Sequence, residues 1–409
     1  MKRNPRPLMG LVFVLVVVLS LGACAEGAKR LRPSGVQGVL GDDGALPFGS
    51  YIERQRAAIR AARTDLDGPY GASVVDWNAP FELRPAEGPA VRGPSGRYRR
   101  AILLTHGLSD SPYMMRAVGS FLQSRGFLVR AVLLPGHGTV PGDLLRVDRL
   151  DWIKTVEYGL GTIRQEAEEV YLGGFSTGGA LSFLLALREP DIRGLVLFSP
   201  AFAVKDRRAP LAGVARLFKD WVGGPRADLN PVKYESFAVN GAYQIYLLTR
   251  DIEEEIDAGK RVRAPVFVAA SAQDATVDTG RTMAVLSRAA LSPAGVFIVY
   301  TKDVPACRRL ADPRVVCVNS RLEDRSVLDF SHTSLTIPPG DGLLGERGLW
   351  RDCLHYGDDP ERLKACLTQD GINLGEISEE NLKTGVVRRL GFNPLFDDML
   401  GRLDRFLSR

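Results

Sequence analysis

Six short apolar runs recur through the middle of the chain, and stretches of mixed polarity separate each run from the next. The runs are dominated by Val, Ile, Leu, Phe and Ala, the composition expected of buried strands. Several of the intervening stretches have the length and apolar spacing of amphipathic helices. This alternation predicts a doubly wound α/β fold with a mostly parallel sheet covered on both faces. The predicted strands are residues 100–105, 127–134, 170–175, 194–199, 265–271 and 296–301.

Three segments depart from this alternation. Residues 201–260 carry several aromatic side chains in mostly helical patterns, and an insertion of this size between two strands predicts a helical lid. Residues 302–330 delay the chain after the last predicted strand, and residues 340–385 form a tail before a closing amphipathic helix. Residues 48–409 are therefore expected to form one domain with insertions. The predicted helices are residues 48–63, 113–125, 151–168, 180–187 and 394–407.

The first residues have the composition of an export signal. Three basic residues precede an apolar run over residues 8–21, which is too short for a typical spanning helix. The four residues 21–24, Leu-Gly-Ala-Cys, resemble the lipobox of bacterial lipoproteins, whose Cys is lipidated after residues 1–23 are removed. Residues 24–47, rich in Gly and small polar residues, then predict a flexible tether. An ordinary signal peptide or an uncleaved anchor is the alternative.

This resemblance implies a lipid-anchored protein of the cell envelope. Ala25 follows the Cys, where Asp would favour retention in the inner membrane, so the outer membrane facing the periplasm is expected. Loss of residues 1–23 removes three basic side chains and lowers the formal charge from +5 to +2. That charge is too small to suggest nucleic-acid binding, and no basic stripe with interleaved aromatics occurs.

Besides Cys24 the chain has four cysteines, at positions 307, 317, 353 and 366. An even number in an exported protein indicates two disulfides. Three connectivities are open, and the local one is favoured: Cys307 with Cys317, and Cys353 with Cys366. Neither pair has the tight spacing of a zinc knuckle, so no metal is expected. The sequence also lacks a dinucleotide fingerprint and a phosphate-binding Lys loop, so no cofactor is expected.

The motif Gly174-Phe175-Ser176-Thr177-Gly178 joins a predicted strand to an apolar helix. This spacing is typical of a sharp turn that holds the central Ser in a strained backbone region, with its hydroxyl above the sheet. Small neighbours are needed because the strand and helix backbones come close together there. The pattern alone is also compatible with a simple Gly-rich loop.

The Ser176 motif is one of five motifs that follow one another along the chain in the order found in one enzyme family. The chain resembles the α/β-hydrolase fold enzymes, particularly the carboxylesterase and monoacylglycerol-lipase branch, over roughly residues 100–335. It departs from that pattern in the long gap between Asp274 and His332 and in the Cys-bearing tail. The matching motifs are His106-Gly107, Leu134-Pro135-Gly136-His137-Gly138, the Ser176 turn, Ser271 to Asp278, and Ser331-His332-Thr333.

The resemblance implies a catalytic triad. Ser176 is the expected nucleophile, His332 the general base and Asp274 the carboxylate that orients the imidazole. His355 in the tail is the alternative base. His106 and His137 lie in tight Gly-bearing turns and are expected to brace loops instead.

The acid and the oxyanion hole are assigned in the same way. Asp278 and Asp303 are alternatives to Asp274, although Asp278 suits a helix cap better. The family geometry implies that the backbone N–H groups of Leu108 and Thr177 stabilise the oxyanion. The aromatics of the lid either line an apolar substrate pocket or pack the core of the insertion.

The function expected from these features is serine-dependent hydrolysis of carboxylic esters, without a cofactor. Monoacylglycerols and lysophospholipids are the substrates that the resemblance and the membrane anchor suggest. A serine peptidase or amidase on the same scaffold is the alternative enzyme. A non-catalytic envelope lipoprotein that keeps the fold is the third hypothesis.

Overall fold

The computed structural model describes residues 29–36, 46–71, 73–88 and 90–409. The predicted signal peptide, Cys24 and most of the predicted tether lie outside these residues. Within the described part, no helix is both long enough and apolar enough to cross a membrane.

An eight-stranded sheet forms the centre of the domain, in the order β1-β3-β2-β4-β5-β6-β7-β8. Only β1 is antiparallel to its neighbour, and the remaining pairs are parallel. The predicted doubly wound, mostly parallel sheet of the α/β-hydrolase fold is therefore confirmed. The strands are β1 (Phe81–Leu83), β2 (Tyr98–Thr105), β3 (Phe127–Val132), β4 (Ala167–Phe175), β5 (Gly194–Phe198), β6 (Val266–Ser271), β7 (Val296–Thr301) and β8 (Val315–Asn319).

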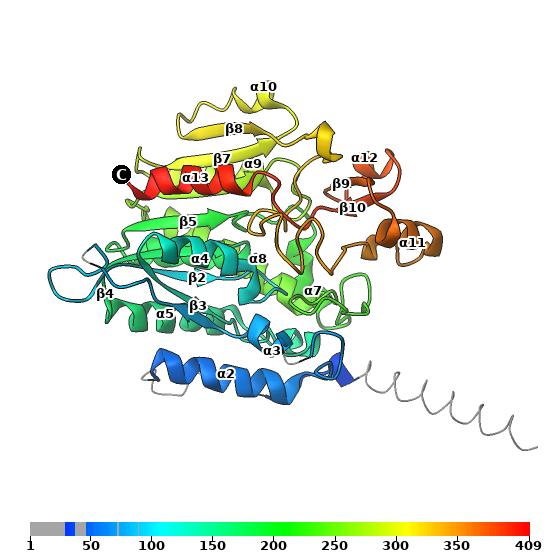
Figure 1. Cartoon of the computed structure of the whole chain (residues 1–409), viewed down its shortest axis with the longest axis horizontal. Coiled ribbons are helices and arrows are strands. Elements are labelled where there is room, and N and C mark those ends of the chain that lie inside the picture. Colours follow the sequence, from blue (N-terminus) through cyan, green and yellow to red (C-terminus); the bar gives the residue numbers. More distant parts are fainter. Residues whose placement is uncertain (1–28, 37–45, 72, 89) are drawn as a thin grey trace, which may run out of the picture.

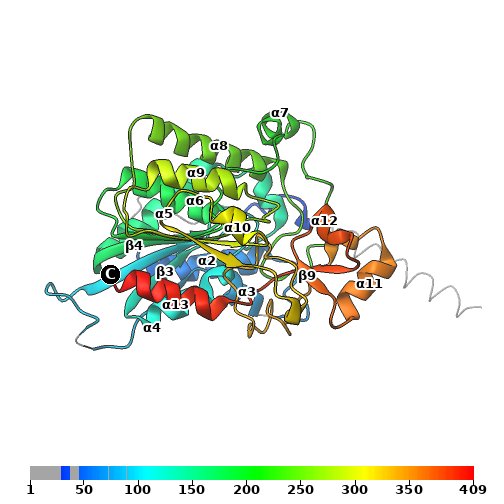
Figure 2. The same ribbon diagram turned by 90° about the horizontal axis from the view of Figure 1, so that it is seen from above.

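Helices cover both faces of the sheet (Figures 1 and 2). One face packs against α5, α6, α8 and α9, and α2 joins the same apolar cluster near the β3 end of the sheet. The other face packs against α4 and α13. The helices are α2 (Phe48–Ala62), α3 (Ser73–Asn78), α4 (Arg116–Ser124), α5 (Arg149–Arg164), α6 (Thr177–Arg188), α8 (Val239–Asp257), α9 (Thr279–Ala289) and α13 (Phe396–Leu407).

All six predicted strands are present, and the structure adds two to the main sheet that the sequence analysis did not predict. Strand β1 has three residues, and β8 lies in the predicted insertion 302–330 at the edge of the sheet. The side chains of β8 are only half-buried, because one side of this edge strand has no neighbour. Strand β1 is too short to give a clear pattern, and the apolar run of β8, residues 315–318, lies inside the segment that was predicted to be an insertion.

The insertion between β5 and β6, which was predicted to be a lid, has two parts. Helix α8, in its second half, packs through Leu248, Ile252 and Ile256 into the main core and lies against α6. Residues 203–231, which we call the lid segment, contain the short helix α7 (Ala212–Ala215) and carry most of the exposed surface of the insertion. Figure 2 shows α7 standing beyond α8.

The tail folds into a small unit beside the carboxyl end of the sheet, on the right of Figure 1. It contains α11 (Pro360–Thr368), α12 (Glu379–Leu382) and a parallel pair of strands, β9 (Asn373–Gly375) and β10 (Val387–Arg389). Both disulfides form in the predicted pairing. The edge disulfide, Cys307–Cys317, joins α10 (Val304–Cys307) to β8, and the tail disulfide, Cys353–Cys366, joins the start of the tail to α11.

Part of the predicted tether is bound to the domain. The backbone N–H and hydroxyl of Ser34 donate hydrogen bonds to the Asp143 carboxylate, at 2.6 and 2.9 Å. Arg30 forms an ion pair with Asp228 of the lid segment. Residues 29–36 therefore do not behave as a free tether, because two charged or polar anchors hold them against the surface.

Candidate active site

Ser176 occupies the turn between β4 and α6. Its backbone has φ 53° and ψ −113°, a strained conformation that the turn imposes. Two glycines make the turn possible. A Cβ on Gly174 would lie 2.3 Å from the carbonyl carbon of Gly178, and a Cβ on Gly178 would lie 2.0 Å from the Thr105 carbonyl oxygen. The motif therefore folds as its spacing predicts.

The structure brings Ser176, His332 and Asp274 together at the carboxyl end of the sheet. The Nε2 atom of His332 lies 3.0 Å from the Oγ atom of Ser176. The Nδ1–H of the same ring donates to Oδ2 of Asp274 at 2.6 Å. All three side chains are buried, with exposed fractions of 7%, 6% and 1% for Ser, His and Asp.

The Asp274 carboxylate is oriented by its own loop. Its Oδ1 atom accepts hydrogen bonds from the backbone N–H groups of Thr276 and Val277, at 2.7 and 2.8 Å. Its Oδ2 atom is thereby directed at the imidazole. The carboxylate fixes the Nδ1–H tautomer, which leaves Nε2 free to accept a proton from the serine hydroxyl.

The alternative acids and the alternative base lie elsewhere. Asp278 caps the N-terminus of α9, and Asp303 caps α10, each by accepting a backbone N–H. The Nε2 atom of His355 lies 2.9 Å from the carbonyl oxygen of Val387, within the tail. None of the three is a hydrogen-bond partner of the Ser–His pair.

His106 and His137 brace the loops after β2 and β3, as expected from their turns. The Leu134 N–H donates to His106 Nε2 at 3.0 Å, and His106 Nδ1–H donates to the Gly107 carbonyl at 2.8 Å. Burial lowers the pKa of His106 well below its usual value, and the nearby His137 lowers it further. Burial also lowers the pKa of His137, to about 4. Both rings are therefore neutral at pH 7.

The two expected oxyanion donors lie close to each other. Thr177 is the first residue of α6, so its backbone N–H belongs to the helix turn that has no partner within the helix. The Leu108 N–H donates to the side-chain hydroxyl of Thr177 at 3.2 Å. The Thr177 hydroxyl therefore holds the Leu108 loop in place, a contact that sequence reasoning missed.

A buried carboxylate from the tail also reaches the site. Glu376 accepts hydrogen bonds from the backbone N–H groups of His332 and Ala275, the residue after Asp274. Nothing in the sequence marked this residue, because it lies 44 positions beyond His332 in a segment without a recognisable motif.

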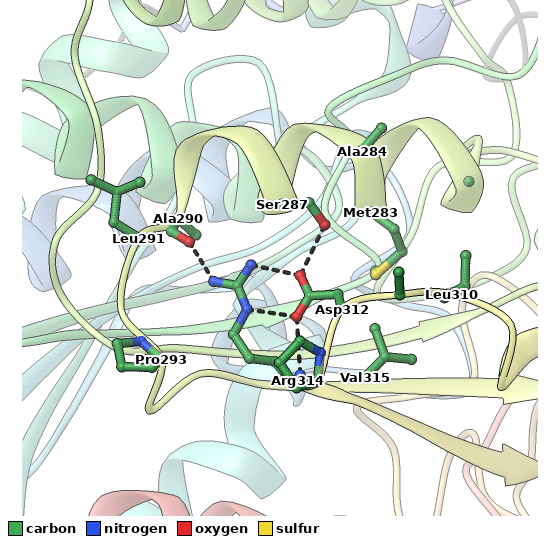
Figure 3. Close-up of a pocket in the computed structure, with 13 residues that line it drawn as sticks. Met283, Ala284, Ser287, Ala290, Leu291, Pro293, Leu310, Asp312, Arg314 and Val315 are labelled. Carbon is green, nitrogen blue, oxygen red and sulfur yellow. Dashed lines mark hydrogen bonds and ion pairs between the residues drawn. The ribbon is translucent and has the colours of Figure 1, made fainter.

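Two further features of the chain were considered as possible sites. Among the residues that the structure describes, no group of three or more His, Cys, Asp or Glu side chains is placed to hold a metal ion. A pocket of about 660 Å³ lies between α9 and the residues that lead into β8 (Figure 3). Its charged side chains, Asp312 and Arg314, pair with each other there, and none of the three triad candidates lines it.

Known proteins that resemble this chain are hydrolases. The family described as serine aminopeptidase S33 matches residues 96–292. The thermostable monoacylglycerol lipase of Bacillus sp. (strain H-257) is 29% identical over 47% of this chain and 75% of its own length. The carboxylesterase of Bacillus subtilis (strain 168) is 28% identical over 44% of this chain and 74% of its own length.

Among solved structures, a soluble variant of monoglyceride lipase from Saccharomyces cerevisiae aligns with a TM-score of 0.44 and 12% identity. The alignment covers 55% of this chain and 82% of that chain. This likeness is distant, so the assignment depends on the sheet order, the serine turn and the sequence relatives. The chain has the α/β-hydrolase fold and is related in sequence to carboxylic ester hydrolases.

Proposed function

We propose that the protein is a serine carboxylic ester hydrolase that uses Ser176, His332 and Asp274 as a catalytic triad. The observation that carries this proposal is a continuous chain of two hydrogen bonds. The first joins the Ser176 hydroxyl to the His332 imidazole at 3.0 Å, and the second joins that imidazole to the Asp274 carboxylate at 2.6 Å. A serine hydroxyl is a weak nucleophile and needs such a line to react at neutral pH.

The reaction proceeds in two halves. Ser176 Oγ attacks the ester carbonyl carbon while its proton moves to His332 Nε2. The bond from that carbon to the leaving oxygen then breaks, the imidazolium gives its proton to the departing alcohol, and an acyl-enzyme remains. Water attacks the acyl group and gives a proton to His332, which returns that proton to Ser176 Oγ as the carboxylic acid leaves.

The backbone N–H groups of Leu108 and Thr177 are the proposed donors to the oxyanion. The Leu108 N–H, which donates to the Thr177 hydroxyl at 3.2 Å, would be shared with the substrate oxygen when the tetrahedral intermediate forms. Loss of one such donor typically costs about 2.7–4 kcal/mol of transition-state stabilisation.

The surface of the lid segment supports an apolar, lipid-like substrate. It exposes six large apolar side chains, of which Phe218 is the most exposed at 85%. Several exposed large apolar side chains within one short segment are typical of contact with a membrane or a partner. The six side chains are Leu211, Val214, Leu217, Phe218, Val222 and Leu229.

The bound N-terminal segment favours the membrane. Arg30 pairs with Asp228 of the lid segment and lies only six positions after the proposed lipidation site at Cys24. Six residues span at most about 20 Å, so a lipid on Cys24 would lie close to the lid. We therefore infer an envelope-anchored enzyme that acts on monoacylglycerols, lysophospholipids or similar acyl esters at the membrane surface.

The first test separates an enzyme from a scaffold. A fluorophosphonate probe should label the wild-type protein at Ser176, and Ser176→Ala should lose the label and the hydrolysis of p-nitrophenyl esters. His332→Ala should lower kcat by about three orders of magnitude or more. His355→Ala is the matched control and should retain wild-type kcat. Equal losses in both histidine variants would contradict the assignment.

A second test addresses the lid. Leu217→Asp combined with Phe218→Asp should lower hydrolysis of monoacylglycerol in phospholipid vesicles and leave hydrolysis of a soluble p-nitrophenyl acetate unchanged. Equal losses on both substrates would argue against a membrane-facing lid.

The peptidase alternative is kept because the matching family is described as serine aminopeptidase S33. Aminoacyl p-nitroanilides test it directly. A kcat/KM on these amides above that on the matched esters would replace the esterase assignment.

A further inference from the structure

Glu376 is a buried carboxylate at the junction of the two loops that carry the proposed base and acid. Its Oε2 atom accepts hydrogen bonds from the backbone N–H of His332 at 3.0 Å and from that of Ala275 at 3.2 Å. Because Ala275 directly follows Asp274, one oxygen atom ties together the backbones on either side of the His–Asp hydrogen bond. The Glu376 side chain itself has no exposed surface.

Glu376 is held firmly by its own neighbours. Its backbone N–H donates to Oδ1 of Asp329 at 2.7 Å, and its carbonyl accepts from the Asn381 side chain at 2.9 Å. Its second carboxylate oxygen accepts the Ile377 N–H at 2.8 Å and lies 3.5 Å from the Arg389 guanidinium. Every polar atom of the residue therefore has a partner, and the carboxylate has one defined position.

The support for Glu376 comes from the tail. Glu376 directly follows β9, which pairs with β10, and Arg389 is the last residue of β10. The tail disulfide closes the unit from which β9 and β10 come. The Cys-bearing tail thus delivers one buried carboxylate to the centre of the proposed active site.

We propose that Glu376 is a positioning residue for the triad, which fixes the spacing of the His332 and Asp274 loops. This inference depends on the proposed function, because it assigns Glu376 a role in the activity of that triad. Glu376 touches backbone rather than reacting atoms, so it acts through His332. Displacement of a catalytic group by about 1 Å can cost up to about 100-fold in rate, so a clamp at this point controls kcat.

The proposal depends on the length of the side chain at position 376 rather than on its charge. Glu376→Asp keeps the charge, but its carboxylate is one methylene shorter and cannot hold both N–H groups. Glu376→Gln loses the charge and keeps an oxygen at the same distance, which can accept both N–H groups. The NH2 group of the new amide then faces two other donors, the Ile377 N–H and Arg389. Glu376→Gln is therefore expected to lower the melting temperature, while its activity stays close to that of wild type.

The experiment compares these two variants with wild type and with Glu379→Gln. Glu379 is an exposed residue of α12 that pairs with Lys383 at the surface, and it serves as the matched control from the same tail. kcat and KM are measured on a p-nitrophenyl ester, and the concentration of active sites is set by exhaustive fluorophosphonate labelling. The rate constant of that labelling is recorded as well. Normalisation to labelled sites removes the effect of unfolded protein.

We expect Glu376→Asp to lower kcat per labelled site about ten- to 100-fold, with little change in KM and a parallel fall in labelling rate. Glu376→Gln should stay within about threefold of wild type, like Glu379→Gln. If Glu376→Asp keeps wild-type kcat per site, or if Glu376→Gln is the more damaged of the two, the clamp is refuted. If the wild-type protein labels at Ser176 and hydrolyses no ester, the proposed function fails instead, and the labelling rates still decide the role of Glu376.

Discussion

Protonation of the buried histidines should set the acid limit of stability, and His137 permits a quantitative test. Its ring lies in the turn after β3, packed near His106 and Trp152. Burial lowers its pKa from 6.5 to about 4 in the folded protein, and hydrogen bonds to the carbonyls of Leu134 and Pro135 only partly oppose that effect. The unfolded chain therefore binds a proton at a higher pH than the folded protein does.

The sign of the effect follows from this difference. Above pH 6.5 the ring is neutral in both states, and it makes no pH-dependent contribution. As pH falls from 6.5 towards 4, the ring binds a proton in the unfolded chain and stays neutral in the folded protein, so the free energy of unfolding decreases. The two pKa values give a loss of about 1.4 kcal/mol at pH 5.5 and about 2.5 kcal/mol at pH 4.5. His106, whose pKa is lowered for the same reason, adds to this loss.

The substitution His137→Phe removes the titration with little damage to the hydrogen bonding. The Pro135 carbonyl still accepts from the Trp152 indole at 3.0 Å, and the Leu134 carbonyl still accepts from the backbone N–H of residue 137 at 3.1 Å. Urea unfolding of both proteins at pH 7.5, 5.5 and 4.5 is the assay. Groups other than His106 are expected to titrate alike in the two proteins, so the difference between the curves reports on His137 and on its effect on His106.

We expect the variant to lose about 2.5 kcal/mol less than wild type between pH 7.5 and pH 4.5. Removal of His137 also relieves the repulsion on His106, which acts in the same direction. Parallel curves, with a difference below about 0.5 kcal/mol, would show that the folded protein admits a proton at this ring and would refute the reasoning.

Three further outcomes are expected. Gly178→Ala should remove soluble protein and fluorophosphonate labelling, because its Cβ would meet the Thr105 carbonyl at 2.0 Å, whereas Gly161→Ala in α5 has open space and should be tolerated. Replacement of either disulfide by serines should cost about 3 kcal/mol in urea unfolding, since the two closed loops are similar in length. Only loss of the tail disulfide should also lower kcat per labelled site, and equal kcat in both would contradict the role given to the tail. Burial raises the pKa of Glu235 to about 7, so Glu235→Gln should be more stable than wild type at pH 8, by about 2 kcal/mol, and indistinguishable from it near pH 4.5.

The central sheet and the residues of the proposed triad were predictable from the sequence for a physical reason. Buried parallel strands need continuous apolar runs, and a nucleophile turn needs glycine where backbones touch. Each requirement produces a pattern within a short stretch of the sequence, which can be recognised without knowledge of the fold. The order Ser176, Asp274, His332 then follows from the topology of the fold, and the structure brings these three side chains together.

The features that sequence reasoning missed depend on contacts between distant segments. The apolar run of the edge strand β8 is short and lies in a segment predicted to be an insertion, and α8 was grouped with the lid because it lies in the insertion between two predicted strands. Residues 29–36 look like a tether in composition, yet Ser34 is bound to Asp143, which lies 109 positions away. Contacts of this kind leave no periodic pattern that one segment alone could reveal.

The family match covers only some of the proposed site residues. The matched region ends at residue 292, so it contains Ser176 and Asp274 but neither His332 nor Glu376. The proposed base must nevertheless lie within 3.0 Å of the nucleophile, and the backbone N–H that fixes its loop is bound by a carboxylate from the tail. A hydrolase without this tail must hold its histidine loop by other contacts. The family match therefore covers the proposed nucleophile and acid, whereas the proposed base and the carboxylate that binds its loop lie outside the matched residues.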